Sequence, residues 1–233
     1  MEKASFDQRL AASQVGSILI AGYGSCFIMG LPMHKTYNEQ ADLGLVSAYL
    51  ADRGLHAERF PHPQTQAGKT PDFRVRQDGT LRAYCEVKSP TDPWLDDPLD
   101  GAPPLTLVGG ARPDPIFNRL SRLLMKADAR LAAVNPTSEE LNILAYVNHD
   151  DASSYKDLRE ILTGYFRAAD GTKHPTMMDI AEGCIGEAKR RIDAFLWFEG
   201  WSGRMAGAVI NIVDPERVRR TCSLLEFDSG RIR

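Results

Sequence analysis

The sequence lacks the features that mark several common classes of protein. Its four cysteines, Cys26, Cys85, Cys184 and Cys222, are far apart and include no CxxC pair, which argues against a zinc site and favours reduced thiols. Cationic residues are not in excess, because 28 Lys and Arg stand against 31 Asp and Glu, for a formal net charge of −3. Proteins that coat nucleic acid non-specifically are usually basic. Any contact with phosphates must therefore come from a local basic patch.

No apolar segment is long enough to suggest a membrane helix. The apolar stretch of residues 15–32 is interrupted by four glycines, whereas a membrane helix needs about 20 predominantly apolar residues. The basic region that precedes the apolar run of a signal peptide is also missing. There are no repeats, and 43% apolar and 25% charged residues are ordinary for a soluble domain. We therefore expect a cytoplasmic protein that makes no membrane contact.

The order of elements predicts an α/β domain over residues 37–213. Helical spacing of Ala41, Leu45, Ala48 and Tyr49 predicts a helix between residues 37 and 54. The near-continuous apolar run of residues 141–147 is typical of a strand that is buried on both faces. Further strands are expected over 55–60, 72–76, 81–89, 192–198 and 205–213, and further helices over 116–134, 155–166 and 178–190.

Three segments fall outside this pattern. Residues 1–36 form an N-terminal extension, interpreted as a helix followed by a glycine-rich apolar segment, and residues 214–233 form a basic C-terminal segment. Residues 90–115 contain seven prolines, a density at which we expect no regular element. Because long loops inside compact domains are usually functional or disordered, we expect this loop to shape substrate access. Trp94 within it is a candidate for stacking on a nucleic-acid base.

Two acids and a lysine are brought together by a predicted hairpin. Glu86 and Lys88 are two residues apart on one strand, so their side chains leave the same face. The dipeptide 78–79, Asp-Gly, is a hairpin turn signal, and antiparallel pairing would bring Asp72 to Glu86. Two carboxylates suit Mg²⁺, which stabilises charge on a phosphodiester and activates water. Lys88 would position that water, deprotonate it or stabilise the transition state, and the sequence leaves these roles open.

The motif formed by Pro71-Asp72 and Glu86-Val87-Lys88 resembles that of the PD-(D/E)xK nuclease superfamily, which includes restriction endonucleases and junction resolvases. The resemblance implies a restriction-endonuclease-like αβββαβ core with a mixed central sheet and helices on both faces. It also implies that Asp72, Glu86 and the carbonyl of Val87 bind Mg²⁺ or Mn²⁺, and that Lys88 is the catalytic lysine.

The two helices that flank the motif supply further candidates by the same resemblance. Members of the superfamily often place a Glu on the first core helix, and Glu39 would be that additional metal ligand. The helix that follows the motif often carries a basic or amide residue near the site. Lys126 or Arg130 would match it, with Arg122 on the same basic face as a further substrate contact, and the resemblance does not choose between the first two.

Simpler explanations exist for each of these residues. Glu86 and Lys88 could form an exposed ion pair, which is worth at most about 1 kcal/mol, and Glu39 could merely favour the dipole of its helix. The sequence predicts a Mg²⁺-dependent endonuclease whose substrate is a nucleic acid, with DNA expected. The alternative is an inactive nuclease-like domain that binds nucleic acid or protein. RNA also stays open as the substrate. A homodimer stays open as well, because no segment indicates an interface.

Overall fold

The computed structural model describes residues 18–20, 26–29, 38–61, 70–91, 107–110, 116–150, 153–168, 170–175 and 179–228. The chain divides into two compact units, residues 1–35 with 93–113, and residues 36–92 with 114–233. The N-terminal stretch and most of the proline-rich segment therefore belong to the same unit. The larger unit contains the predicted hairpin and also the C-terminal residues from 214 onward.

The smaller unit contains an antiparallel sheet of three strands. Its order is β1-β2-β6, with β1 at Ile18–Ile20, β2 at Cys26–Met29 and β6 at Leu107–Gly110. The expectation that residues 90–115 hold no regular element was therefore wrong. The reason is local, because residues 105–112 contain no proline, and β6 can donate its N–H groups to β2.

The larger unit is an α/β structure built on a six-stranded mixed sheet of order β11-β10-β7-β5-β4-β3. Strands β5, β7 and β10 run parallel, whereas β3, β4 and β5 pair antiparallel, as do β10 and β11. Asp78 and Gly79 both have positive φ, as a two-residue type I′ turn requires, and they join β4 to β5. The strands are β3 (His56–Arg59), β4 (Phe73–Gln77), β5 (Thr80–Lys88), β7 (Leu141–Asn148), β10 (Ala194–Glu199) and β11 (Arg204–Ile210), with a separate pair β8 (Tyr165–Arg167) and β9 (Lys173–Pro175).

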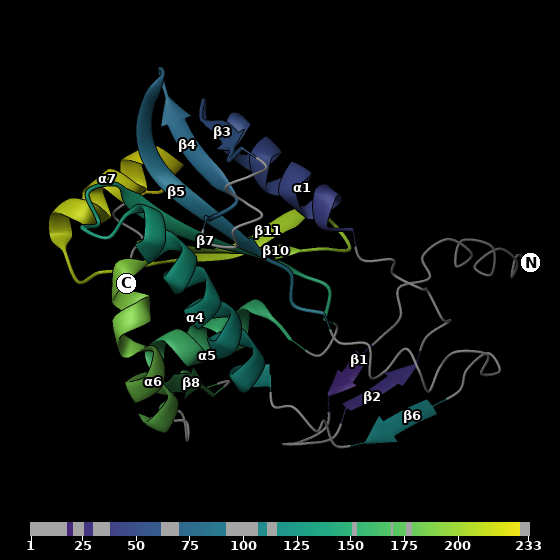
Figure 1. The fold of residues 1–233 in the computed structure, drawn as a ribbon. Coiled ribbons are helices and arrows are strands. Elements are labelled where there is room, and N and C mark those ends of the chain that lie inside the picture. Colours follow the sequence, from purple (N-terminus) through teal and green to yellow (C-terminus); the bar gives the residue numbers. More distant parts are fainter. Residues whose placement is uncertain are drawn as a thin grey trace, which may run out of the picture. The chain divides into compact units, whose positions relative to one another are not determined.

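Helices cover both faces of this sheet (Figure 1). Helices α1 and α7 pack on one face, the α1 face, while α4, α5 and α6 pack on the other, the α4 face. Strand alternation separates the two cores, since Cys85 and Val87 contribute to the α1 face and Leu144 and Trp197 to the α4 face. In the described part of the chain no helix could cross a membrane. The helices are α1 (Glu39–Ala51), α4 (Ile116–Val134), α5 (Tyr155–Thr163), α6 (Asp179–Arg191) and α7 (Pro215–Leu225).

Helix α1 begins as predicted but buries a different side. The Asn38 side chain accepts hydrogen bonds from the backbone N–H groups of residues 40 and 41, as an N-cap does. The buried residues are Asp42, Leu43, Val46 and Leu50. The predicted apolar stripe was wrong in part, because residues 41 and 48 are exposed. Apolar residues occur on more than one side of this helix, so their periodicity alone does not select the buried one.

Two further helix boundaries differ from the sequence prediction. Helix α5 stops at Thr163 and not at residue 166, because Gly164 takes a left-handed φ of 72° and the next residues form β8. Helix α7 was not predicted at all. It begins after Asp214, whose side chain accepts from the backbone N–H groups of residues 216 and 217, and it buries Leu224 and Leu225 in the α1-face core. The basic C-terminal segment is thus largely a packed helix.

Candidate functional site

The β4–β5 hairpin places Asp72 beside Glu86. Phe73, the first residue of β4, pairs with Cys85, so Asp72, which comes immediately before β4, stands opposite Glu86. The Oδ2 atom of Asp72 accepts a hydrogen bond from the Val87 backbone N–H at 2.8 Å. Both acids are buried, with Glu86 0% and Asp72 9% exposed. Since Phe73 and Cys85 point into the α1-face core, the two acids lie toward the α4 face.

Two cations converge on one oxygen of Glu86. Its Oε1 atom accepts from Nζ of Lys88 and from Nη1 of Arg130, the latter at 2.7 Å. The Lys88 side chain is 11% exposed, whereas that of Arg130, which comes from α4, is 37% exposed. The other oxygen, Oε2, is buried and has no hydrogen-bond partner among the described residues. One carboxylate oxygen is thus saturated, and the other is left for a ligand.

The electrostatics of Glu86 reflect this crowding. Burial and the nearby Asp72 charge raise the pKa of its carboxyl, Lys88 and Arg130 lower it, and the net result is a pKa of about 7. Two acids this close cannot both ionise cheaply in a buried place. A divalent cation between them would favour the ionised form of both.

The residues present fit a hard divalent cation with few protein ligands. In the part of the chain that the structure describes, no group of three or more His, Cys, Asp or Glu side chains could hold a metal. Mg²⁺, however, is usually bound through one or two carboxylates and keeps several waters. Asp72 and Glu86 supply those carboxylates, and the buried Oε2 of Glu86 lacks a partner. In a strand, the N–H and C=O of one residue face the same neighbour, so the Val87 carbonyl lies on the Asp72 side.

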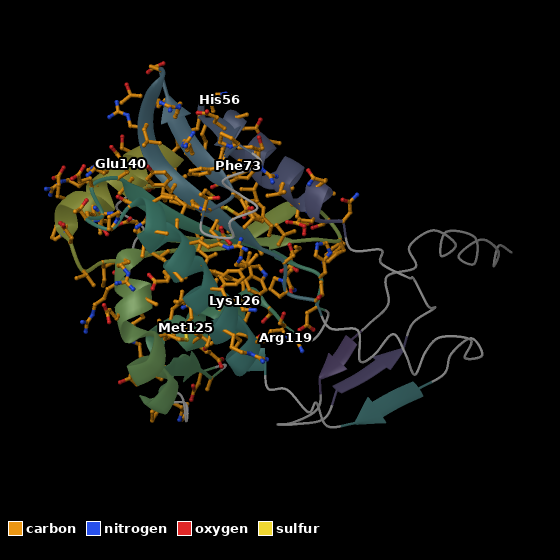
Figure 2. The ribbon with its side chains drawn as sticks, in the orientation of Figure 1. His56, Phe73, Arg119, Met125, Lys126 and Glu140 are labelled. Carbon is orange, nitrogen blue, oxygen red and sulfur yellow. The ribbon has the colours of Figure 1, made fainter. Side chains whose placement is uncertain are left out.

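The basic residues of α4 extend from this pair along one side of the helix. Arg122, Lys126 and Arg130 follow at helical spacing, and Arg122 and Lys126 are exposed. Lys126 projects from the middle of α4 (Figure 2). Of the two residues that the sequence left undecided, Arg130 is the one that contacts Glu86. A basic stripe, here Arg122, Lys126 and Arg130, therefore begins at the acid pair.

One predicted site residue, Glu39, is not brought to the acid pair, and another lies outside the described residues. Glu39 lies in the first turn of α1 and is exposed, and within the described ranges no hydrogen bond or ion pair joins it to Asp72 or Glu86. Trp94 lies outside the described residues.

A second polar cluster, formed by Asp42, Ser89 and His149 and called here the Asp42 cluster, was missed by the sequence reasoning. Ser89 Oγ donates to Asp42 Oδ2 at 2.5 Å, and His149 Nε2 lies 2.9 Å from Asp42 Oδ1. Asp42 is only 4% exposed. The available signal was the acid itself, which shares the buried side of α1 with Leu43 and Val46.

Comparison with known proteins found no relative of this chain. No family model, no curated protein and no solved structure matches this chain.

Proposed function

We propose that the chain is a nuclease of the PD-(D/E)xK type that hydrolyses phosphodiester bonds in DNA with Mg²⁺ or Mn²⁺. The observation that carries the proposal is the buried pair of Asp72 and Glu86 on one hairpin, with Lys88 against Glu86. Within the larger unit, which does not include β6, the element order α1-β3-β4-β5-α4-β7 supports it, because it has the αβββαβ order of a restriction-endonuclease-like core. The parallel pairing of β5 with β7 makes the sheet mixed, as such a core requires.

Each residue of the site has a distinct role in this proposal. Asp72, Glu86 and the Val87 carbonyl would hold the metal, which when bound stabilises charge on the phosphate and lowers the pKa of the attacking water. Lys88 is held at the end of β5 beside the acids, where its ammonium group can donate a hydrogen bond to the water and orient it.

In this proposal, the basic stripe of α4 binds the substrate. The guanidinium group of Arg130 can bind two phosphate oxygens at once, and it is exposed enough to leave Glu86 for a phosphate. Lys126 and Arg122 follow at intervals of four residues, or about 6 Å along the helix axis. They would contact neighbouring phosphates of the same strand, which supplies the local basic patch that a protein of net charge −3 needs.

One observation favours a second candidate function, a nuclease-like domain that binds without cutting. Lys88 and Arg130 both donate to Glu86 Oε1, and the exposed Glu39 forms no hydrogen bond or ion pair with the acid pair among the described residues. A protein that had lost metal binding would need such compensation, because an unpaired buried carboxylate is costly. The two functions differ in whether the acid pair takes up a cation.

The deciding experiment combines metal titration with a cleavage assay. We expect wild type to bind Mn²⁺ by calorimetry, Asp72→Ala to lose that binding, and wild type to cut plasmid DNA with Mg²⁺ but not with EDTA. Lys88→Ala should lower cleavage by about 100-fold or more while it still binds Mn²⁺. Lys126→Ala is the matched control, since this exposed lysine should affect substrate affinity more than turnover. No Mn²⁺ binding and no cleavage of plasmid, single-stranded DNA or RNA would refute the nuclease and favour the binding module.

A further inference from the structure

The C-terminal end of β5 is held from both faces of the sheet. On the α4 face, Lys88 donates to Glu86. On the α1 face, the next residue, Ser89, donates to Asp42 at 2.5 Å. One residue further, the Pro90 carbonyl accepts from the His149 backbone N–H at 2.9 Å. Three consecutive residues are therefore anchored, and two of the anchors pass through the Asp42 cluster.

The cluster joins segments that are far apart in the chain. Asp42 comes from the first turns of α1, 47 residues before Ser89 and 107 residues before His149. The His149 ring also packs tightly on the backbone of Gly200, where an added Cβ would lie 2.4 Å from Cε1 and 2.5 Å from Nδ1. Gly200 in turn donates its N–H to the Asn148 carbonyl at 2.8 Å. The ring is thus fixed between the end of β10 and the Asp42 carboxylate.

The connectivity excludes a nucleophilic triad. In such a triad the imidazole lies between the hydroxyl and the carboxylate, so that it can take the hydroxyl proton. Here the carboxylate lies between the hydroxyl of Ser89 and the imidazole of His149. The hydroxyl is therefore not activated as a nucleophile, and the acid instead binds two separate segments at the edge where β5 and β7 end.

We propose that Asp42 is a positioning residue for Lys88. Through Ser89 and His149 it fixes the backbone at the end of β5, and with it the place of the Lys88 ammonium group relative to the acid pair. This inference rests on the proposed role of Lys88 in the reaction. A displacement of about 1 Å in a catalytic group can cost about 100-fold in rate.

The metal ligands do not depend on the same anchor. Asp72 and Glu86 directly adjoin the Phe73–Cys85 pair of β4 and β5, Glu86 also pairs with Leu144 of β7, and Val87 N donates a hydrogen bond to Asp72 Oδ2. Loss of Asp42 should therefore disturb Lys88 without disturbing the cation site. This separation distinguishes a positioning role from a general contribution to folding.

The test compares Asp42→Ala with Asp42→Asn. In Asp42→Ala we expect kcat to fall about tenfold or more, with KM and the Mn²⁺ dissociation constant within about twofold of wild type. Asp42→Asn should retain most of the activity, because the amide can accept from Ser89 and still pair with His149. Asp193→Ala is the control, since Asp193 is an equally buried acid, 4% exposed, that accepts from Asn142 N at 2.7 Å at the opposite end of the sheet.

A second readout needs no activity. Lysines are labelled with a small amine-reactive reagent and the products are measured by mass spectrometry. The extent of labelling at Lys88 should be about threefold or more higher in Asp42→Ala than in wild type, while exposed Lys126 reacts equally in all variants. If Asp42→Ala does not fold, Ser89→Ala should show the same rise at Lys88 to a smaller degree. The inference would be overturned if Lys88 in Asp42→Ala and Ser89→Ala is labelled to the same extent as in wild type. It would also be overturned if labelling at Lys88 rises equally in Asp193→Ala. A wild type that cuts nothing would refute the proposed function, whereas the labelling would still decide the role of Asp42.

Discussion

A change of pH should alter metal binding in a direction that Glu86 dictates. Burial and the Asp72 charge raise the pKa of this carboxyl to about 7 in the metal-free protein. A carboxylate must lose its proton before it binds a cation. With that pKa, about 90% of the molecules are ionised near pH 8 and about 10% near pH 6. We therefore expect the apparent Mn²⁺ affinity to fall about tenfold between these pH values, with nearly one proton released per ion bound at the lower pH.

Calorimetry measures both quantities at once. The titration is run at each pH in two buffers of different ionisation enthalpy, so that the difference in heat reports the protons released on binding. Glu86→Gln is the control, because its amide does not titrate and its remaining weak affinity should not follow the same pH dependence. Equal wild-type affinity at pH 6 and pH 8, with heats independent of the buffer, would refute the reasoning that Glu86 is the buried ligand that must deprotonate.

Three further predictions concern stability. Because the folded pKa of Glu86 lies above its ordinary value of 4.5, the contribution of this group to the free energy of unfolding is full below pH 4.5 and is lost as pH rises through about 7. In denaturant unfolding with EDTA, Glu86→Gln should therefore be more stable than wild type at pH 8, by up to about 3 kcal/mol, and nearly equal to it near pH 4. A difference that does not change with pH would contradict this. Gly207→Ala should lower the free energy of unfolding by about 1 to 3 kcal/mol, because the added Cβ would lie 2.5 Å from Tyr155 Cε1. The control is Gly186→Ala in α6, where an added Cβ meets nothing within 4 Å and no stability should be lost. Arg217→Ala should cost about 3 kcal/mol in the same assay, because it leaves buried Asp193 without its cation, and a loss below about 1 kcal/mol would show that solvent replaces it.

Local signals were sufficient for the hairpin and not for the contacts between distant segments. The Asp78-Gly79 turn and the alternation along β4 and β5 are readable from neighbouring residues, and they predicted that Asp72 and Glu86 would meet. The β2–β6 pairing joins Met29 to Leu107, so no local pattern could reveal it. The contact of Arg130 with Glu86 was foreseen only as one of two options, since helical spacing puts Lys126 on the same side.

The missed features have two different causes. The start of α7 carried a readable signal, an N-cap Asp214 followed by Pro215, but its charged surface was read as a basic tail. The Asp42 cluster had no comparable signal, because it requires the ends of β5 and β7 and the start of α1 to converge. A buried acid on a helix side is visible in sequence only when the buried side is known, and α1 carries apolar residues on more than one side.

The sequence separations of the groups around Glu86 determine the order in which these groups meet as the chain refolds. The two acids are joined by a tight hairpin, a structure that forms in microseconds, whereas Arg130 reaches Glu86 across 44 residues that include strand β6 of the smaller unit. Closing that longer loop takes more time, so the acids approach each other before Arg130 reaches Glu86. Divalent cations in the refolding buffer should therefore speed the early steps, and Arg130 should matter mainly to the unfolding rate.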